Sequence, residues 1–247
     1  HVLRSQPPPP QSMVLTTLVT SPLVRGVCAG RDVEVVDDLL VGFKHHAGYA
    51  EEARTMTNLF SVEESHGYVR GDAVRDKDGA MAALLLCECA ADMKQQGGTL
   101  HDRLREIWRA CGYHREKTTS IYARGLRGRV EIERLMAAWR SAAPSEFGGL
   151  EVVSVTDRTT PRTTGSVTRD LPGNVLVFEL EGDDGACRLV LRPSGTEPKV
   201  KAYVLARGAP GVADAALDAQ IALVDALVDR VAVDAVAAAE RVMKSAP

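Results

Sequence analysis

Residues 188–206 read R-L-V-L-R-P-S-G-T-E-P-K-V-K-A-Y-V-L-A, and they decide how the second half of the chain folds. The two ends of this stretch, Arg188–Leu191 and Val200–Ala206, are rich in apolar and branched residues, which favour β-strands. The segment between them holds two prolines, a glycine, a serine and a threonine, a composition typical of a turn. We therefore expect two strands joined by a polar loop.

The rest of the second half predicts further strands and two amphipathic helices. Gly182–Gly185, G-D-D-G, is typical of a hairpin turn. In the last 35 residues, apolar side chains recur at helical spacing against aspartates, which is typical of a helix that covers a sheet. The predicted elements are strands at Thr118–Ala123, Leu150–Val155 and Val175–Leu180, and helices at Val130–Arg140 and Val212–Met243.

The first half of the chain combines predicted strands with helices. Apolar stretches at Met13–Thr20, Val33–Phe43 and Asn58–Val62 each run into a polar loop. Such strands, each feeding a polar loop, suggest an α/β layer. A helix is expected at Ala80–Lys94, because two glycines follow it closely. A further helix at Leu100–Ala110 follows Thr99 and Asp102, which resemble a capping box.

Composition excludes several classes of protein. The 247 residues correspond to one large domain or two modest ones. Lys and Arg (30) nearly balance Asp and Glu (33), so the net charge of −3 provides no overall field for nucleic acid or an acidic membrane. No apolar run approaches the roughly 20 residues that cross a bilayer. Five cysteines form no dense disulfide pattern, so we expect a cytoplasmic protein with reduced thiols. From the charge balance and the short apolar runs we expect no nucleic-acid or membrane partner.

The N-terminal residues are unlike the rest. His1–Gln11 include four consecutive prolines, Pro7–Pro10, which favour polyproline II. We expect residues 1–12 to form a disordered Pro-rich segment outside the core. Because the first residue is not Met, we also expect the chain to be a piece of a longer one.

The polar loop of residues 192–199 is a candidate phosphate site. Arg192 offers a planar guanidinium, Ser194 and Thr196 offer hydroxyls, and Gly195 allows the backbone to approach a ligand closely. The alternative is a tight hairpin that merely carries polar residues.

Two further loops carry polar groups suited to a ligand. Glu63 and Ser65 would point to the same side if their strand continues, and a carboxylate beside a hydroxyl can hold a sugar; the alternative is a solvated acidic turn. Lys77, just before a predicted helix, is a candidate proton shuttle or phosphate ligand, against the alternative of a charged first turn with Asp78 as cap. His45 and His46 lack a nearby acidic ligand at metal spacing, so we predict no metal site there.

Four motifs, in this order, resemble those of the α-D-phosphohexomutases, the phosphoglucomutase/phosphomannomutase family. They cover most of the chain from about Met13 onward. The motifs are G-F-K at Gly42–Lys44, E-E-S-H-G-Y at Glu63–Tyr68, R-D-K-D-G at Arg75–Gly79 and R-P-S-G-T-E-P-K at Arg192–Lys199.

The resemblance implies the third and fourth domains of a four-domain enzyme. Residues 13–112 would form an α/β domain with a mixed sheet and helices. Residues 113–247 would form an α+β C-terminal domain with a mainly antiparallel sheet covered by helices. Enzymes of this family interconvert hexose 1-phosphates and 6-phosphates through a phosphoserine and a bisphosphate. By motif match, the sugar-binding residues would be Gly42, Lys44, Glu63 and Ser65, the candidate general acid/base Lys77, and the phosphate-binding residues Arg192, Ser194, Gly195 and Thr196.

The sequence also departs from the family pattern. The serine loop that carries the nucleophile and the aspartate loop that carries magnesium have no match in this sequence. The complete enzyme would use Mg²⁺ and a hexose 1,6-bisphosphate, whereas we predict no metal ligands and no activity for this chain alone. Its expected partners are a sugar phosphate substrate and the N-terminal domains of the same enzyme. The alternative is a non-catalytic sugar-phosphate-binding fragment or a degenerate relative.

Overall fold

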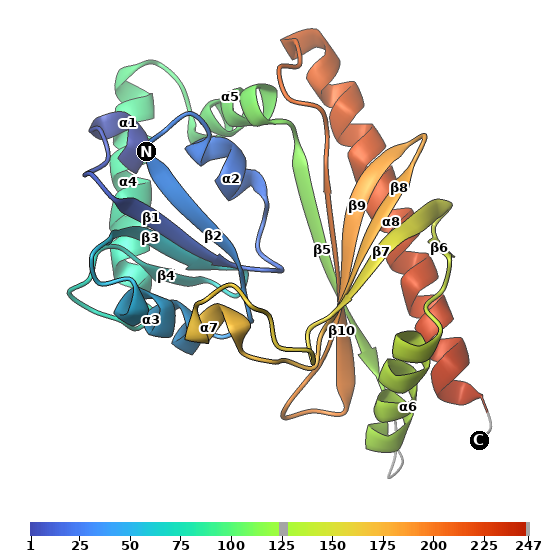
Figure 1. The fold of residues 1–247 in the computed structure, drawn as a ribbon. Helices are drawn as coiled ribbons and strands as arrows, with labels where there is room; N and C mark the ends of the chain where they lie inside the picture. The colour runs from blue at the N-terminus through green and yellow to red at the C-terminus, as the bar shows by residue number, and fades with distance from the viewer. Residues whose placement is uncertain (124–127, 246–247) are drawn as a thin grey trace. The chain divides into compact units, whose positions relative to one another are not determined.

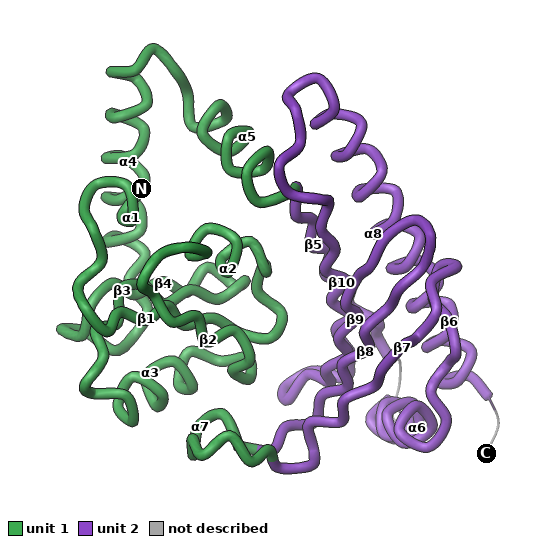
Figure 2. Tube along the Cα trace, turned by 45° about the horizontal axis from the view of Figure 1, so that its top comes forward, with its two compact units in different colours: residues 1–112, 162–171 green, residues 113–161, 172–247 purple. Residues whose placement is uncertain are grey.

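The computed structural model describes residues 1–123 and 128–245 and divides the chain into two units. Unit 1 consists of residues 1–112 and 162–171, and unit 2 of residues 113–161 and 172–247 (Figure 2). We expected a single boundary at residue 112, but residues 162–171 also belong to unit 1. Residues 124–127 and 246–247 of the expected C-terminal domain lie outside the described residues.

Unit 1 is built on a four-stranded sheet with the order β2-β1-β3-β4 (Figure 1). β1 (Ser12–Thr17) pairs in parallel with both β2 (Val33–Leu39) and β3 (Thr57–Glu63). β4 (Gly67–Val69) pairs antiparallel with β3. The sheet is therefore mixed, as expected for an α/β layer.

Each face of this sheet buries a separate group of apolar side chains. Met13 and Leu15 of β1 pack on one face with residues of β2 and of α3 (Phe43–Glu52). Val14 packs on the opposite face with α2 (Leu23–Cys28). Successive side chains of a strand point to opposite faces, so an apolar strand such as β1 contributes to both.

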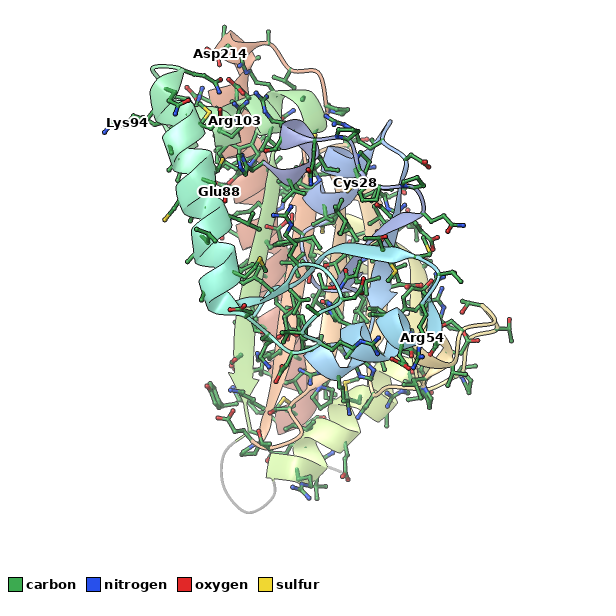
Figure 3. All side chains as sticks on the ribbon, turned by 90° about the vertical axis from the view of Figure 1, so that its left-hand side faces the viewer. Cys28, Arg54, Glu88, Lys94, Arg103 and Asp214 are labelled. Atoms are coloured by element: carbon green, nitrogen blue, oxygen red, sulfur yellow. The ribbon has the colours of Figure 1, made fainter. Side chains whose placement is uncertain are left out.

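The first twelve residues differ from the disordered segment that we expected. Val2–Ser5 form a short helix, α1, and Val2 and Leu3 pack against the apolar cluster around Val14. The His1 Nε2 atom lies 3.6 Å from the carboxylate of Glu88 on α4 (Gly79–Gln95), a helix visible in Figure 3. These apolar contacts on one face of the sheet bring the residues before the prolines into unit 1.

The two helices that close the first half have side-chain caps, and Asp78 has the capping role that was the alternative interpretation of the R-D-K-D-G segment. α4 (Gly79–Gln95) begins after Asp78, whose Oδ1 accepts the N–H groups of Ala80 (3.0 Å) and Met81 (3.1 Å). α5 (Leu100–Cys111) begins with the predicted capping box. Thr99 Oγ1 accepts the N–H of Asp102 at 3.2 Å, and Asp102 Oδ2 accepts the N–H of Thr99 at 2.8 Å.

Unit 2 contains a six-stranded antiparallel sheet with the order β5-β10-β9-β8-β7-β6. The predicted hairpin turn at residues 182–185 is confirmed, because Gly182 ends one strand and pairs with Gly185 at the start of the next. All neighbours in this sheet run antiparallel, as the resemblance implied. The strands are β5 (His114–Tyr122), β6 (Glu146–Phe147), β7 (Leu150–Asp157), β8 (Leu176–Gly182), β9 (Gly185–Pro193) and β10 (Lys199–Arg207).

Two helices pack against this sheet. The long helix α8 (Asp214–Lys244) contacts β5 and β10 and runs along the sheet in Figure 1. α6 (Gly128–Ser141) contacts α8 and β10, and its Trp139 ring lies 5.4 Å from the ring of Phe147 and 5.8 Å from that of Phe178. Aromatic rings at these separations interact favourably beyond their burial, so this cluster anchors α6 on the core.

Residues 162–171 leave the connection between β7 and β8 and fold with unit 1. Arg169 donates to both carboxylate oxygens of Asp38 (3.0 Å from Nε to Oδ1 and 2.8 Å from Nη2 to Oδ2), and Arg162 also binds this carboxylate. Glu52 accepts hydrogen bonds from the Ser166 hydroxyl at 2.7 Å and from the backbone N–H of Thr168 at 2.6 Å, at the start of the short helix α7 (Val167–Asp170). Two carboxylates of unit 1 therefore hold this segment.

We expect Asp38→Asn to loosen residues 162–171 while unit 1 remains folded. The variant loses charge-assisted hydrogen bonds that contribute about 1.5–3 kcal/mol, so amide hydrogen exchange in α7 should accelerate roughly 10- to 150-fold. Asp37→Asn is the matched control, because Asp37 pairs with Arg25 instead. Equal exchange in α7 of both variants would contradict the prediction.

The same contact predicts a dependence on pH. Burial disfavours ionisation of Asp38, but the hydrogen bonds and charges of Arg169 and Arg162 outweigh it and hold the pKa of this carboxyl below its ordinary value. The contribution of Asp38 to the stability of the folded chain is therefore complete above the ordinary aspartate pKa, and it is lost as the pH falls through the lowered pKa.

Candidate functional site

The candidate residues of unit 1 lie at one edge of its sheet. The parallel strands β1, β2 and β3 all end at this edge, since parallel strands share their direction. The G-F-K loop follows β2, and the E-E-S turn follows β3. In open α/β sheets, ligands bind outside the carboxyl ends of the strands. The predicted sugar-binding residues are therefore at the edge where a ligand site is expected.

The G-F-K loop is shaped by Gly42. Its φ of +126° is rarely accessible to a residue with a side chain, so this turn requires glycine. The Gly42 carbonyl accepts the N–H of His45 at 2.9 Å, and α3 begins at Phe43. The strand predicted to continue to Phe43 instead ends at Leu39, because this glycine turn starts a helix. Lys44 is exposed at the start of α3.

Glu63 is the last residue of β3 and is only 6% exposed. It pairs across the sheet with Gly67 of β4. A Cβ atom on Gly67 would lie 2.6 Å from Glu63 Oε1 and 2.7 Å from Glu63 Cγ, so the absence of a side chain makes room for Glu63. Ser65 lies in the exposed turn after the strand has ended, so the strand does not continue as the alternation of Glu63 and Ser65 required.

The neighbouring Glu64 has a role that the sequence analysis missed. Its Oε2 accepts a hydrogen bond from Thr17 Oγ1 at 3.2 Å, and the Thr17 and Thr20 hydroxyls lie 2.8 Å apart. Thr17 and Thr20 are buried at and just beyond the end of β1. The threonine-rich sequence T-T-L-V-T is the only signal for this contact, and it is also typical of a strand.

Lys77 lies beside the G-F-K loop. Its Nζ atom is 5.8 Å from the centre of the Phe43 ring and 3.8 Å from Asp76 Oδ1. A lysine over an aromatic face gains a weak electrostatic attraction, which helps to hold it there. The structure thus brings together the R-D-K-D-G and G-F-K motifs, which are 30 residues apart in the sequence.

His46 is a buried histidine rather than part of a ligand cluster. It is 1% exposed, its ring stacks on Phe43 at 4.7 Å, and neither ring nitrogen has a hydrogen-bond partner among the described residues. Burial, with a smaller effect from His45, lowers the pKa of His46 to about 4. In the parts of the chain that the structure describes, no group of three or more His, Cys, Asp and Glu could hold a metal ion.

The polar loop of unit 2 connects β9 to β10 and is closed by its own hydrogen bonds. Ser194 Oγ accepts the N–H groups of Thr196 (3.4 Å) and Glu197 (3.3 Å), and the Ser194 N–H donates to the Lys199 carbonyl at 2.8 Å. Gly195 and Thr196 are exposed at the tip. A Cβ atom on Gly195 would meet no atom within 4 Å, so nothing in the loop itself requires glycine there.

Arg192 ends the β9 side of this loop. It is partly buried, and its guanidinium forms no hydrogen bond or ion pair with any residue that the structure describes. Lys201 lies directly opposite Arg192 across the β9–β10 pair, so the two side chains project from the same face of the sheet. The face beside the loop is therefore locally positive, although the whole chain has a net charge of −3.

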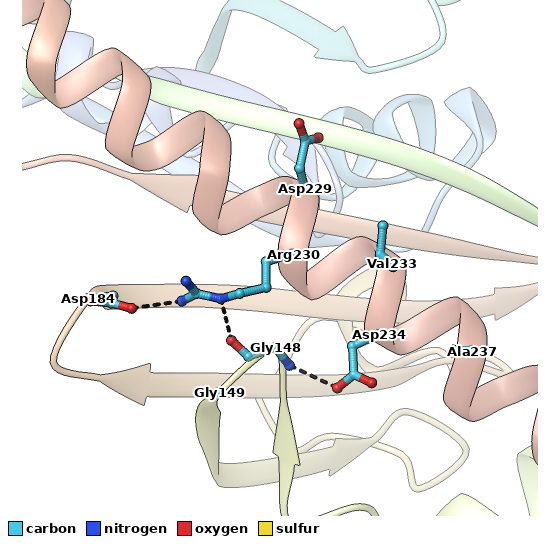
Figure 4. A pocket seen from close by; sticks show the side chains of 8 residues that line it. All are labelled: Gly148, Gly149, Asp184, Asp229, Arg230, Val233, Asp234 and Ala237. Atoms are coloured by element: carbon cyan, nitrogen blue, oxygen red, sulfur yellow. Dashed lines mark hydrogen bonds and ion pairs between the residues drawn. The ribbon is translucent and has the colours of Figure 1, made fainter.

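A hollow elsewhere in unit 2 does not suit an anion. It is lined by α8 and the turn before β7, and Figure 4 shows Arg230 there donating to the Gly148 carbonyl (2.5 Å) and to Asp184 (2.9 Å). Asp229 and Asp234 also line it, so its one arginine is already paired amid three carboxylates. Asp184 precedes β9 and the polar loop follows it, which places the hollow at the opposite end of that strand.

Comparisons with known proteins identify relatives of both halves. The family model described as phosphoglucomutase/phosphomannomutase, alpha/beta/alpha domain III, matches residues 1–111. The phosphoglucomutase of Staphylococcus haemolyticus (strain JCSC1435) is 34% identical over 204 residues, which cover 79% of this chain and 36% of the relative. That of Staphylococcus aureus (strain MRSA252) is 34% identical over 203 residues, 78% of this chain and 35% of the relative. The chain thus spans just over a third of these relatives.

A solved structure has a similar fold. The open form of the exocytosis-sensitive phosphoprotein pp63/parafusin, a phosphoglucomutase from Paramecium, is similar with a TM-score of 0.53 and 17% identity. The match covers 89% of this chain and 38% of that one. Among the described residues, no helix is both long and apolar enough to cross a membrane.

We expect Gly67→Ala to destabilise unit 1 by displacing Glu63. Overpacking of this kind costs about 1–3 kcal/mol of unfolding free energy, which urea titration would measure. Glu63→Ala in the Gly67→Ala background should recover part of this loss, because the clash is with the Glu63 side chain. A double variant whose destabilisation is the sum of the two single ones would refute the contact.

We also expect His46 to make stability depend on pH. Because folding lowers its pKa from an ordinary 6.5 to about 4, the unfolded chain binds a proton more readily, and stability falls as the pH drops through this window. The loss approaches about 3 kcal/mol near pH 4. The His46→Leu variant should lack this part of the slope between pH 7 and 4 in chemical unfolding. Parallel pH profiles for both proteins would be inconsistent with a buried neutral His46.

Proposed function

Since the chain belongs to the α-D-phosphohexomutase family and represents a C-terminal part of it, we propose that it recognises a hexose phosphate. Specifically, we propose that it supplies the sugar and distal-phosphate contacts of a phosphoglucomutase/phosphomannomutase-type enzyme. Such an enzyme interconverts hexose 1-phosphates and 6-phosphates through a phosphoserine and a bisphosphate.

The observation that carries this proposal is a partly buried arginine of unit 2 whose guanidinium has no partner among the described residues. The Arg192 guanidinium has no hydrogen-bond or ionic partner among the described residues, although the residue is partly buried next to a loop with two hydroxyl residues. A guanidinium that gives up part of its hydration needs an acceptor, and its planar fork matches a phosphate. We propose that Arg192, Ser194, Gly195 and Thr196 bind the phosphate that does not react.

Gly195 supports this assignment independently. Neither a steric contact nor a positive φ demands glycine there, since a Cβ atom would point into open space. Glycine remains useful at that position for a different reason, because a ligand can approach a backbone N–H without meeting a side chain. We therefore expect the loop backbone to contact the phosphate.

Unit 1 would provide the sugar contacts. We propose that the Glu63 carboxylate accepts hydrogen bonds from sugar hydroxyls and that the Ser65 hydroxyl donates to or accepts from them. Gly42 and Lys44 would line the site. The pairing of Glu64 with Thr17 supports this, because it holds the E-E-S turn at the edge of the sheet where the strands end.

Lys77 is the proposed general acid/base. Its ammonium group lies at the surface over Phe43, where it could transfer a proton to or from a sugar hydroxyl. The described residues offer no site for the magnesium ion that the family implies, because they contain no group of three or more His, Cys, Asp or Glu side chains that could hold a metal ion. We accordingly assign no step to a metal and propose that this chain alone does not turn over substrate.

The test is binding of glucose 1,6-bisphosphate to the whole chain, measured by calorimetry and by the shift in thermal unfolding. Arg192→Ala should weaken binding by about 1.5–3 kcal/mol, or roughly 10- to 150-fold, the range for a lost charge-assisted hydrogen bond.

Arg188→Ala is the matched control, because Arg188 lies on the same strand and face but is paired with Glu179 at 2.6 Å. It should bind the bisphosphate like the original chain. If Arg192→Ala binds equally well, the phosphate assignment is wrong. If the folded chain does not bind the bisphosphate at all, the proposed recognition does not hold for this polypeptide.

A further inference from the structure

We propose that Lys199 is a positioning residue of the phosphate loop, which holds the Glu197 carboxylate and neutralises its charge. This inference rests on the proposed phosphate site and adds to it a residue that does not itself bind the ligand. It answers a problem that the loop poses: Glu197 places a negative charge three residues after Ser194, within a loop proposed to bind an anion.

The geometry of the loop ties Glu197 to Lys199 twice. The Lys199 Nζ atom lies 2.7 Å from Glu197 Oε2, and the Lys199 N–H donates to the Glu197 carbonyl at 2.8 Å. The Lys199 carbonyl in turn accepts the N–H of Ser194 at 2.8 Å. One residue thus holds the acidic side chain and closes the loop that carries Ser194.

The neighbouring strand keeps the Lys199 side chain in place. Tyr122 of β5 lies directly opposite Lys199 across the β10–β5 pair, and the Lys199 Nζ atom is 5.4 Å from the centre of its ring. The Lys199 side chain is only 13% exposed, whereas that of Glu197 is 53% exposed. The hydrogen bond to Glu197 raises the pKa of Lys199, which keeps the ammonium form. The lysine is therefore the fixed partner, and the carboxylate is drawn to it.

Three cations lie beside the loop, and they are in different situations: Lys201, opposite Arg192, lies 5.9 Å from the centre of the Tyr203 ring. Lys199 is already bound to a carboxylate and lies against an aromatic ring, whereas Arg192 has no partner among the described residues. Of Lys199 and Arg192, Arg192 is therefore the group available to an anion. Releasing Lys199 to bind phosphate would leave Glu197 unneutralised beside the same phosphate, which would cancel much of the gain.

Four chains test the inference: the original chain, Lys199→Met, Glu197→Gln and the double variant. Binding of glucose 1,6-bisphosphate is measured at low ionic strength, and thermal unfolding shows that each is folded. Lys199→Met should weaken binding roughly three- to tenfold, because it frees a unit charge near a phosphate dianion in a largely aqueous setting. Glu197→Gln alone should change binding by less than about twofold, since that charge is already neutralised.

The decisive result is the double variant, which should bind within about twofold of the original chain. If Lys199 were a direct ligand, the double variant would remain weak, and the effects of the two substitutions would simply combine. That result overturns the inference. The loss in Lys199→Met should also shrink as salt is added.

Lys117 and Asp229 form the matched control pair. They are also 2.7 Å apart in unit 2, but they join β5 to α8 and are not part of the loop. Lys117→Met should leave binding unchanged; a loss equal to that of Lys199→Met would mean that net charge alone matters and would overturn the inference.

The Arg192→Ala variant separates the two proposals. If Arg192→Ala loses binding and the Lys199→Met, Glu197→Gln double variant is not rescued, the role of Lys199 is refuted and the proposal of the phosphate site stands. Normal binding in Arg192→Ala refutes the phosphate site, and the inference with it.

Discussion

Backbone hydrogen bonding between neighbouring strands positions the G-F-K loop, the E-E-S turn and the polar loop of this protein. In unit 1, the parallel pairing of β1 with β2 and β3 makes three strands end at one edge, so the G-F-K loop and the E-E-S turn emerge there together. In unit 2, the antiparallel register of β9 and β10 sets Arg192 opposite Lys201 and closes the polar loop between them. A register slip of one residue would turn Arg192 to the other face of the sheet.

A second feature recurs among the described residues: carboxylates in or beside loops are held by specific donors. Glu64 is bound by Thr17, Asp38 by two arginines of residues 162–171, and Glu197 by Lys199. The first two contacts join segments far apart in the chain, and the third fixes the conformation of one loop. Each of these contacts costs side-chain entropy. A partly buried contact offsets more of this cost than an exposed one, because water screens its charges less.

Local signals in the sequence predicted much of the fold. The capping box of Thr99 and Asp102, the Asp78 cap and the G-D-D-G turn all depend on residues within a few positions of each other, and the structure has all three. The helix after Gly42 was missed, because an apolar run that ends in G-F-K resembles a strand entering a loop. Likewise, Val2 and Leu3 gain order from contacts with α2 and β1, which no neighbouring residue reveals.

The sequence by itself determined which chemical groups this protein carries, their order along the chain and the family they resemble, because motifs and caps are short-range patterns. Only the tertiary structure decided which of those groups meet. It set Lys77 over Phe43, left Arg192 without a partner among the described residues, and folded residues 162–171 into unit 1. Contacts between residues far apart in the chain depend on strand pairing and packing, and these are properties of the whole sheet rather than of any one segment.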